Sequence, residues 1–182
     1  MTDQPRTLNR RSLAKGAAWS VPAIAIAASA PASATSGPKP TGTALATCKQ
    51  PGGSCSPIVK GYLFKLTLKN NDTSDPIWVY TSGTYAPIIT DSAGLGMTYA
   101  GAYVNGTWYA AGTNFQVPAG ATVTIILNAA SDNSANTPVE GTITVQWGHT
   151  SSPTDDTMHV GDPLVIPYNF TGTPPCDGCT LP

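Results

Sequence analysis

The sequence predicts an all-β fold, an antiparallel β-sandwich of about seven or eight short strands. Apolar residues recur at every second position in several segments, which is the period of a strand with one buried face. The 182 residues include 18 Gly and 17 Pro, which disfavours long helices. Because 41% of the residues are hydrophobic and only 10% are charged, the chain is apolar enough to fold around a core.

The strands are expected in the following segments. Residues 62–69 place Tyr62, Phe64, Leu66 and Leu68 on one face and Leu63, Lys65, Thr67 and Lys69 on the other. The turn-forming residues 70–76 end that strand, and the aromatic and β-branched residues 77–81 begin the next. Two later strands show the same alternation, at Val123, Ile125 and Leu127 and at Ile143, Val145 and Trp147. Residues 163–170 are predicted to be an edge strand, because prolines are tolerated better there.

Asn105-Gly106 gives the clearest local signal, a type I′ turn at the tip of a hairpin. A two-residue loop sets three cross-strand pairs: Val104–Thr107, Tyr103–Trp108 and Ala102–Tyr109. Strict alternation then places Tyr99, Tyr103 and Trp108 on one face and Val104 and Tyr109 on the other.

Two segments, VPAGATVTIIL at 117–127 and EGTITVQW at 140–147, resemble the immunoglobulin-like domains of bacterial surface proteins. The resemblance is generic and implies an immunoglobulin-like β-sandwich used for binding or structure, with no catalytic residues to carry over. The Cys–Trp–Cys core of antibody domains is absent, because no cysteine lies between Cys55 and Cys176.

The N-terminus has the pattern of a secretory signal peptide. Basic residues precede an uncharged, alanine-rich stretch over 16–34 that ends in Ala32-Ser33-Ala34, which predicts cleavage after Ala34. The stretch is short and interrupted by prolines, which disfavours a stable membrane span; an uncleaved membrane anchor is the alternative. The expected organisation is a signal peptide at 1–34, a linker at 35–42, the sandwich at 43–172 and a Cys-containing tail at 173–182.

Arg10, Arg11, Leu13 and Lys15 resemble the twin-arginine export motif. With the alanine-rich segment that follows, they resemble the signal peptides of exported proteins from high-GC Gram-positive bacteria. The resemblance implies contact with the export machinery, transient insertion of the signal peptide in the membrane, and a final place outside the cell or in the cell wall. The alternative is an ordinary Sec signal with two adjacent arginines, which leads to the same side of the membrane.

After cleavage the chain would keep five lysines, nine carboxylates and no arginine, a net charge of −4. Such a chain lacks the basic surface and the bidentate donors with which proteins grip phosphate, so nucleic acid is not an expected partner. No cofactor-binding motif occurs.

Four cysteines, an even number in an exported chain, favour disulfides over a metal site. They are Cys48, Cys55, Cys176 and Cys179. The sequence leaves three connectivities open, of which two local bridges, Cys48–Cys55 and Cys176–Cys179, are the simplest. Bridges between the two ends would stabilise the fold more, provided that the ends are neighbours. Zinc binding and thiol redox chemistry are the weaker alternatives.

No catalytic or metal site is predicted. A hydrolase would require His149 or His159 beside an orienting carboxylate such as Asp155 or Asp156. A glycosidase would require Glu140 opposite Asp132 or Asp162, and a loop calcium site would use Asp72 with Asp75, or Asp132. Loop residues of this composition need no such role.

Tyr99, Tyr103 and Trp108 are the candidate binding face if they are exposed, and core residues if they face the second sheet. We therefore expect a secreted, non-catalytic binding or structural protein of the bacterial cell envelope, whose partner is cell-wall glycan or another surface protein. The alternatives are a small secreted hydrolase acting on wall polymers or peptides, and a carbohydrate-binding module.

Overall fold

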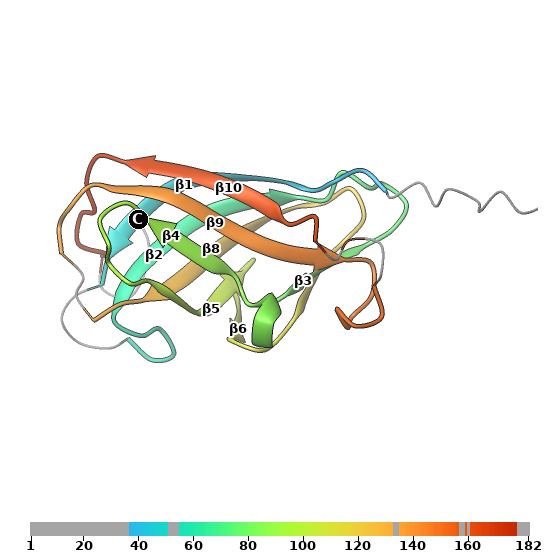
Figure 1. Ribbon diagram of the computed structural model, residues 1–182, viewed down its shortest axis with the longest axis horizontal. Coiled ribbons are helices and arrows are strands. Elements are labelled where there is room, and N and C mark those ends of the chain that lie inside the picture. Colours follow the sequence, from blue (N-terminus) through green and yellow to red (C-terminus); the bar gives the residue numbers. More distant parts are fainter. Residues whose placement is uncertain (1–36, 51–54, 133–134, 157–158, 160, 178–182) are drawn as a thin grey trace, which may run out of the picture. The chain divides into compact units, whose positions relative to one another are not determined.

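Two antiparallel sheets pack face to face in the computed structural model of the protein (Figure 1). Residues 36–182 form one compact unit. The structure describes residues 37–50, 55–132, 135–156, 159 and 161–177. The predicted all-β sandwich is confirmed, but the described residues form ten strands, so the expected number of seven or eight is wrong.

The first sheet has the strand order β1-β2-β8-β5-β6. Its strands are β1 (Thr41–Lys49), β2 (Gly61–Lys69), β8 (Thr122–Ala130), β5 (Thr98–Val104) and β6 (Thr107–Ala110). β1 starts two residues inside the stretch expected to be a linker, and Pro40 just before it is already buried. Its side chains are mostly Thr and Ala, so the apolar alternation that identifies the other long strands is weak.

The second sheet has the order β10-β9-β3-β7, and β4 pairs with β9 beyond the end of β3. Its strands are β3 (Ile77–Tyr80), β4 (Ile88–Asp91), β7 (Phe115–Val117), β9 (Val139–Gly148) and β10 (Leu164–Phe170). β4 and β7 were not predicted, because four- and three-residue strands are too short for a period of two to stand out. β10 is an edge strand containing Pro167, as predicted.

The main core lies between the sheets and is built from the alternating positions predicted for 62–69, 123–127 and 143–147. The first sheet contributes large side chains such as Tyr62, Phe64 and Leu66, and the second contributes Ile143 and Trp147. Burial of this apolar area drives the two layers together. Along one side of the sandwich β1 lies beside β10 (Figure 1).

The predicted hairpin is confirmed in all three pairs, and Asn105 and Gly106 have the positive φ values of 47° and 84° that a type I′ turn requires. The strict alternation of side chains between the two faces fails near the start of β5, because the pairing of β5 with β8 shifts between Tyr99 and Gly101. The expectation that Tyr99 shares a face with Tyr103 and Trp108 is therefore wrong. Tyr99 packs against the main core, whereas the other two lie on the outer face of the first sheet.

A second, smaller apolar cluster covers part of that outer face. Leu63, expected on the solvent side, is fully buried because the segment before β2 and the C-terminal tail fold over it. The tail is not a free appendage: the Lys49 amide donates to the Pro174 carbonyl, and the Cys176 amide donates to the Lys49 carbonyl, both at 2.8 Å. The tail thus runs beside the last residues of β1.

Candidate functional site

Two histidines and a buried carboxylate gather at the end of the sandwich where β9 finishes. Trp147 ends the inward-facing series of β9, His149 follows it, and the loop leading to β10 brings back His159. The His159 ring centroid lies 4.0 Å from that of Trp147 and 4.9 Å from that of His149. The His159 residue is only 3% exposed. The structure therefore brings together two imidazole rings, and the sequence alone did not predict whether they would be close.

Asp156 organises this cluster. Its carboxylate accepts the backbone amides of His149 at 2.6 Å and of His159 at 3.2 Å, so it ties together both ends of the loop that carries it. Gly148 makes room for it, because a Cβ there would overlap the Asp156 carboxylate and the Tyr80 hydroxyl. The sequence identifies Asp156 as a candidate but not Gly148. The only sequence signal for Gly148 is that it directly follows Trp147, a tryptophan that faces the core.

The charges of the cluster follow from its burial. Burial lowers the pKa of His159, and the nearby Asp156 opposes that shift without reversing it, so the imidazole is favoured in its neutral form. The pKa of Asp72 is lowered because its carboxylate accepts the amides of Ser74 and Asp75, and the neighbouring His149 adds to this shift. Asp72 and Asp75 are thus parts of a tight polar turn rather than two ligands turned toward one ion.

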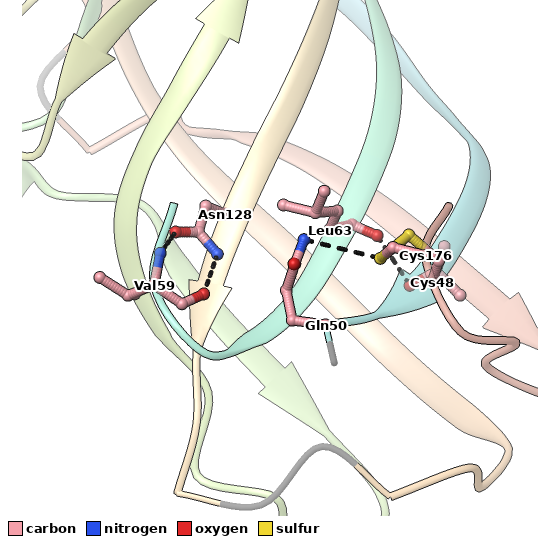
Figure 2. The surroundings of a disulfide bond; sticks show 7 residues. Cys48, Gln50, Val59, Leu63, Asn128 and Cys176 are labelled. Atoms are coloured by element: carbon pink, nitrogen blue, oxygen red, sulfur yellow. Dashed lines mark hydrogen bonds between the residues drawn. A yellow bond between two sulfur atoms is a disulfide. The ribbon is translucent and has the colours of Figure 1, made fainter. Parts of the chain in front are cut away.

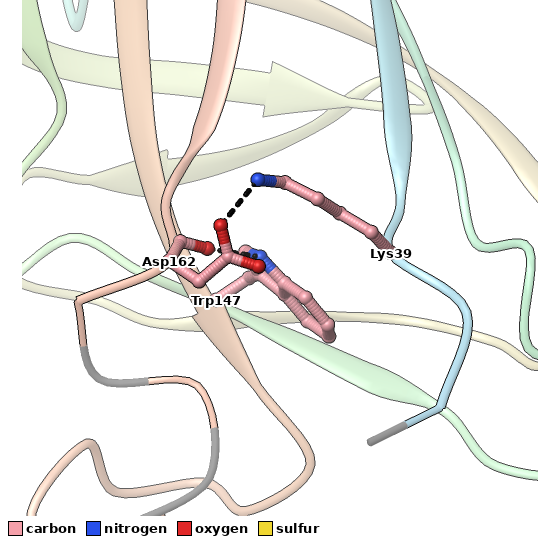
Figure 3. Close-up of polar contacts among 3 residues, drawn as sticks. All are labelled: Lys39, Trp147 and Asp162. Atoms are coloured by element: carbon pink, nitrogen blue, oxygen red, sulfur yellow. Dashed lines mark hydrogen bonds and ion pairs between the residues drawn. The ribbon is translucent and has the colours of Figure 1, made fainter. Parts of the chain in front are cut away.

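An ion pair lies beside Trp147, the tryptophan that His159 contacts (Figure 3). The Lys39 ammonium lies 2.5 Å from the Asp162 carboxylate, and the Trp147 indole N–H donates to the Asp162 backbone carbonyl at 3.1 Å. Both charged side chains are exposed, so the pair contributes about 1 kcal/mol or less. Its effect is to hold the chain preceding β1 against the chain preceding β10.

Burial limits what the histidine cluster can contact. A general base must reach substrate, but the His159 ring is covered, and its Nε2 has no hydrogen-bond partner among the described residues. The two described hydrogen bonds of the Asp156 carboxylate come from backbone amides rather than from an imidazole. In the part of the chain that the structure describes, no group of three or more His, Cys, Asp or Glu side chains is placed to hold a metal ion.

The other carboxylates considered from the sequence are not brought together. Asp132 lines a cleft of about 830 Å³ beside Lys60 and the loop at 94–96, whereas Glu140 lines a separate shallow hollow over β9 and β10. Asp162 is engaged with Lys39, and Asp155 is exposed. The pairs that a glycosidase would need are therefore separated.

Tyr103 and Trp108 form the second candidate site, a pair of aromatic side chains. Both are half-buried on the outer face of the first sheet, with ring centroids 5.0 Å apart and planes inclined at 58°. Trp108 lies directly over Gly101, where any Cβ would meet the indole ring. Gly101 was not singled out from the sequence, because the bulge that gives it this position depends on pairing with β8.

A disulfide belongs to the smaller apolar cluster against which Tyr103 and Trp108 pack. Figure 2 shows the surroundings of this bond. Cys48 at the end of β1 is bonded to Cys176 in the tail, with a Cα–Cα distance of 5.0 Å. The simplest expectation, two local bridges Cys48–Cys55 and Cys176–Cys179, is wrong in both pairs, because the tail runs alongside β1 and brings Cys176 to Cys48. Cys55 is also disulfide-bonded, and its partner lies outside the described residues. Gln50 donates to the Cys176 sulfur at 3.6 Å.

Other predicted residues fall outside the described part of the chain: Arg10, Arg11, Leu13, Lys15, Ala32, Ala34 and Cys179. Within the described part, no helix is long and apolar enough to cross a membrane.

Comparison with known proteins gives the chain no relatives. No protein-family model, no curated protein and no solved structure matches it.

Proposed function

We propose that the protein is a secreted, non-catalytic binding or structural protein of the bacterial cell envelope. The observation that carries this proposal is the half-exposed pair of Tyr103 and Trp108 on the outer face of the first sheet. These rings lie outside the main core, and aromatic side chains left partly open to solvent are favoured contact residues for partners.

Two further points support a place outside the cell. The signal-like N-terminus supports export, and a disulfide joining distant parts of the chain suits an oxidising compartment. We also propose that the sandwich is immunoglobulin-like, since the two segments that carry the resemblance lie mainly in β8 and in β9, which belong to opposite sheets.

The test is co-sedimentation of the purified protein with protein-free cell walls of a high-GC Gram-positive bacterium. A parallel arm uses affinity capture of surface proteins extracted from the same cells. We expect retention in at least one arm, with several-fold loss for Trp108→Ala. Trp78→Ala is the matched control, because Trp78 is a half-buried tryptophan of the other sheet. No retention in either arm, or equal loss for both variants, contradicts the proposal.

A small secreted hydrolase is the second candidate, favoured by the 4.9 Å approach of the His149 and His159 rings. Release of sugars or peptides from wall material, abolished by His149→Gln while the variant stays folded, would replace the first proposal with this one. The covered position of His159 argues against it.

A further inference from the structure

The outer face of the first sheet carries a continuous row of side chains that crosses all five strands. Register places Ala46, Lys65, Ile126, Tyr103 and Trp108 directly opposite one another, one from each of β1, β2, β8, β5 and β6. With neighbouring strands about 4.8 Å apart, Lys65 and Trp108 are separated by roughly 14 Å. The last four of these residues are all half-buried rather than covered.

Hydroxyl groups and a second lysine continue the same face toward the hairpin end of the sheet. One further row joins Thr43, Thr67 and Thr124, and the next joins Thr41, Lys69 and Thr122. We call the surface made by Lys65, Lys69, Tyr103 and Trp108, together with these threonines, the Trp108 face.

The charge of the Trp108 face is opposite to that of the protein. The five strands of the first sheet contain three lysines and no Asp or Glu. Nine carboxylates and five lysines lie in residues 37–182, which is negative as a whole. Among the described residues the only ion pair is Lys39–Asp162, so Lys65 and Lys69 have no acidic partner there. The face therefore suits an anionic ligand.

Resting on the proposed binding function, we infer that the Trp108 face binds an acidic polysaccharide strand. Sugar rings would stack on Trp108 and Tyr103, the threonine hydroxyls would exchange hydrogen bonds with sugar hydroxyls, and Lys65 and Lys69 would pair with carboxylates along the strand. The 58° inclination of the two rings suits successive sugars that are twisted relative to each other. A nucleic acid is disfavoured, because two lysines without arginine neutralise few phosphates.

The probes are polygalacturonate and its fully methyl-esterified form, which keeps the sugar backbone but lacks the charge. Calorimetry at low salt should show binding of the acidic polymer and at least fivefold weaker binding of the ester. Trp108→Ala and the double variant Lys65→Gln/Lys69→Gln should each weaken binding about tenfold. The controls Trp78→Ala and Lys60→Gln should change it less than twofold, since these residues lie on the other sheet and at the sheet end.

Circular dichroism checks that each variant is folded, and Tyr103→Ala, which removes the other ring of the face, replaces Trp108→Ala if that variant unfolds. Equal binding of both polymers, tight binding of single-stranded DNA in their place, or unchanged binding by the Trp108 and lysine variants overturns the inference. So does an absence of binding to polygalacturonate. If polygalacturonate does not bind but the protein is still retained on cell walls or by a surface protein, the proposed function holds and only the acidic ligand is wrong. If the protein is retained by neither, the proposed function is wrong as well.

Discussion

Asn128 holds the segment before β2 onto the outer face of the first sheet, and its removal is the sharpest test of how that face is built. The side chain of Asn128 is fully buried on β8. Its Oδ1 accepts the Val59 amide at 2.9 Å, and its Nδ2 donates to the Val59 carbonyl at 3.2 Å (Figure 2). An amide side chain thus pairs with the main chain of Val59 as a neighbouring strand would.

Asn128→Ala removes both hydrogen bonds. Each is worth about 0.5–1.5 kcal/mol net, so the free energy of unfolding should fall by about 1–3 kcal/mol. Val59 is 39% exposed, so water can replace part of the loss. Cys55 at the start of the segment is disulfide-bonded and keeps it tethered, so we expect the segment to be released locally while the sandwich stays folded.

The assays are urea unfolding followed by circular dichroism and amide hydrogen exchange at Val59. Asn114→Ala is the matched control: it removes a similar pair of bonds, from the Thr81 amide and to the Ser151 carbonyl, and should leave exchange at Val59 unchanged. A loss of stability below 0.5 kcal/mol with unchanged exchange at Val59 would refute the reasoning, because it would show that the segment is held by apolar contacts alone.

Three further predictions concern the core and the histidine cluster. Tyr99→Phe should stabilise the protein by about 1 kcal/mol in thermal unfolding, because the buried hydroxyl has no hydrogen-bond partner among the described residues; a destabilised variant contradicts this. Gly148→Ala should cost about 3 kcal/mol in urea, because the added methyl displaces the Asp156 carboxylate, whereas the same change at the exposed Gly94 loop position should cost less. Burial holds the pKa of His159 below the usual 6.5, so stability should be constant above that pH and fall as the pH drops below it. His159→Gln should flatten this dependence in unfolding measurements from pH 7.5 to 5, and an unchanged slope would exclude His159 as its source.

Local signals in the sequence predict much of the sandwich. The alternation at 62–69 and 143–147 and the Asn-Gly turn depend on neighbouring residues, and they identify β2, β9 and the hairpin with the correct faces. Tyr99 is misplaced because a bulge exists only relative to a partner strand. Tyr99 and its partner Ala129 are thirty residues apart in the sequence, so the bulge cannot be recognised from the residues around Tyr99 alone.

The candidate sites depend still more on long-range geometry. Cys176 meets Cys48 across 128 positions of sequence, and no spacing rule distinguishes that bridge from a local one. Lys65 was recognisable as an outward residue of its strand, but its alignment with Trp108 requires the register of four strands. His149 and His159 meet because Asp156 fastens both ends of their loop, which only the folded structure shows.

The bond between Cys48 and Cys176 also decides how the domain would respond to mechanical pulling at its two ends. Tension entering at Thr41 runs along β1 to Cys48 and crosses the sulfur bridge into the tail. Residues 49–175 lie inside the covalent loop, so the covalent path of the tension bypasses them. The eight residues from Thr41 to Cys48 are already extended, at roughly 3.4 Å each, so tension can peel β1 from β2 but can lengthen the protein very little. Under force applied at its ends, the domain is an almost inextensible connector.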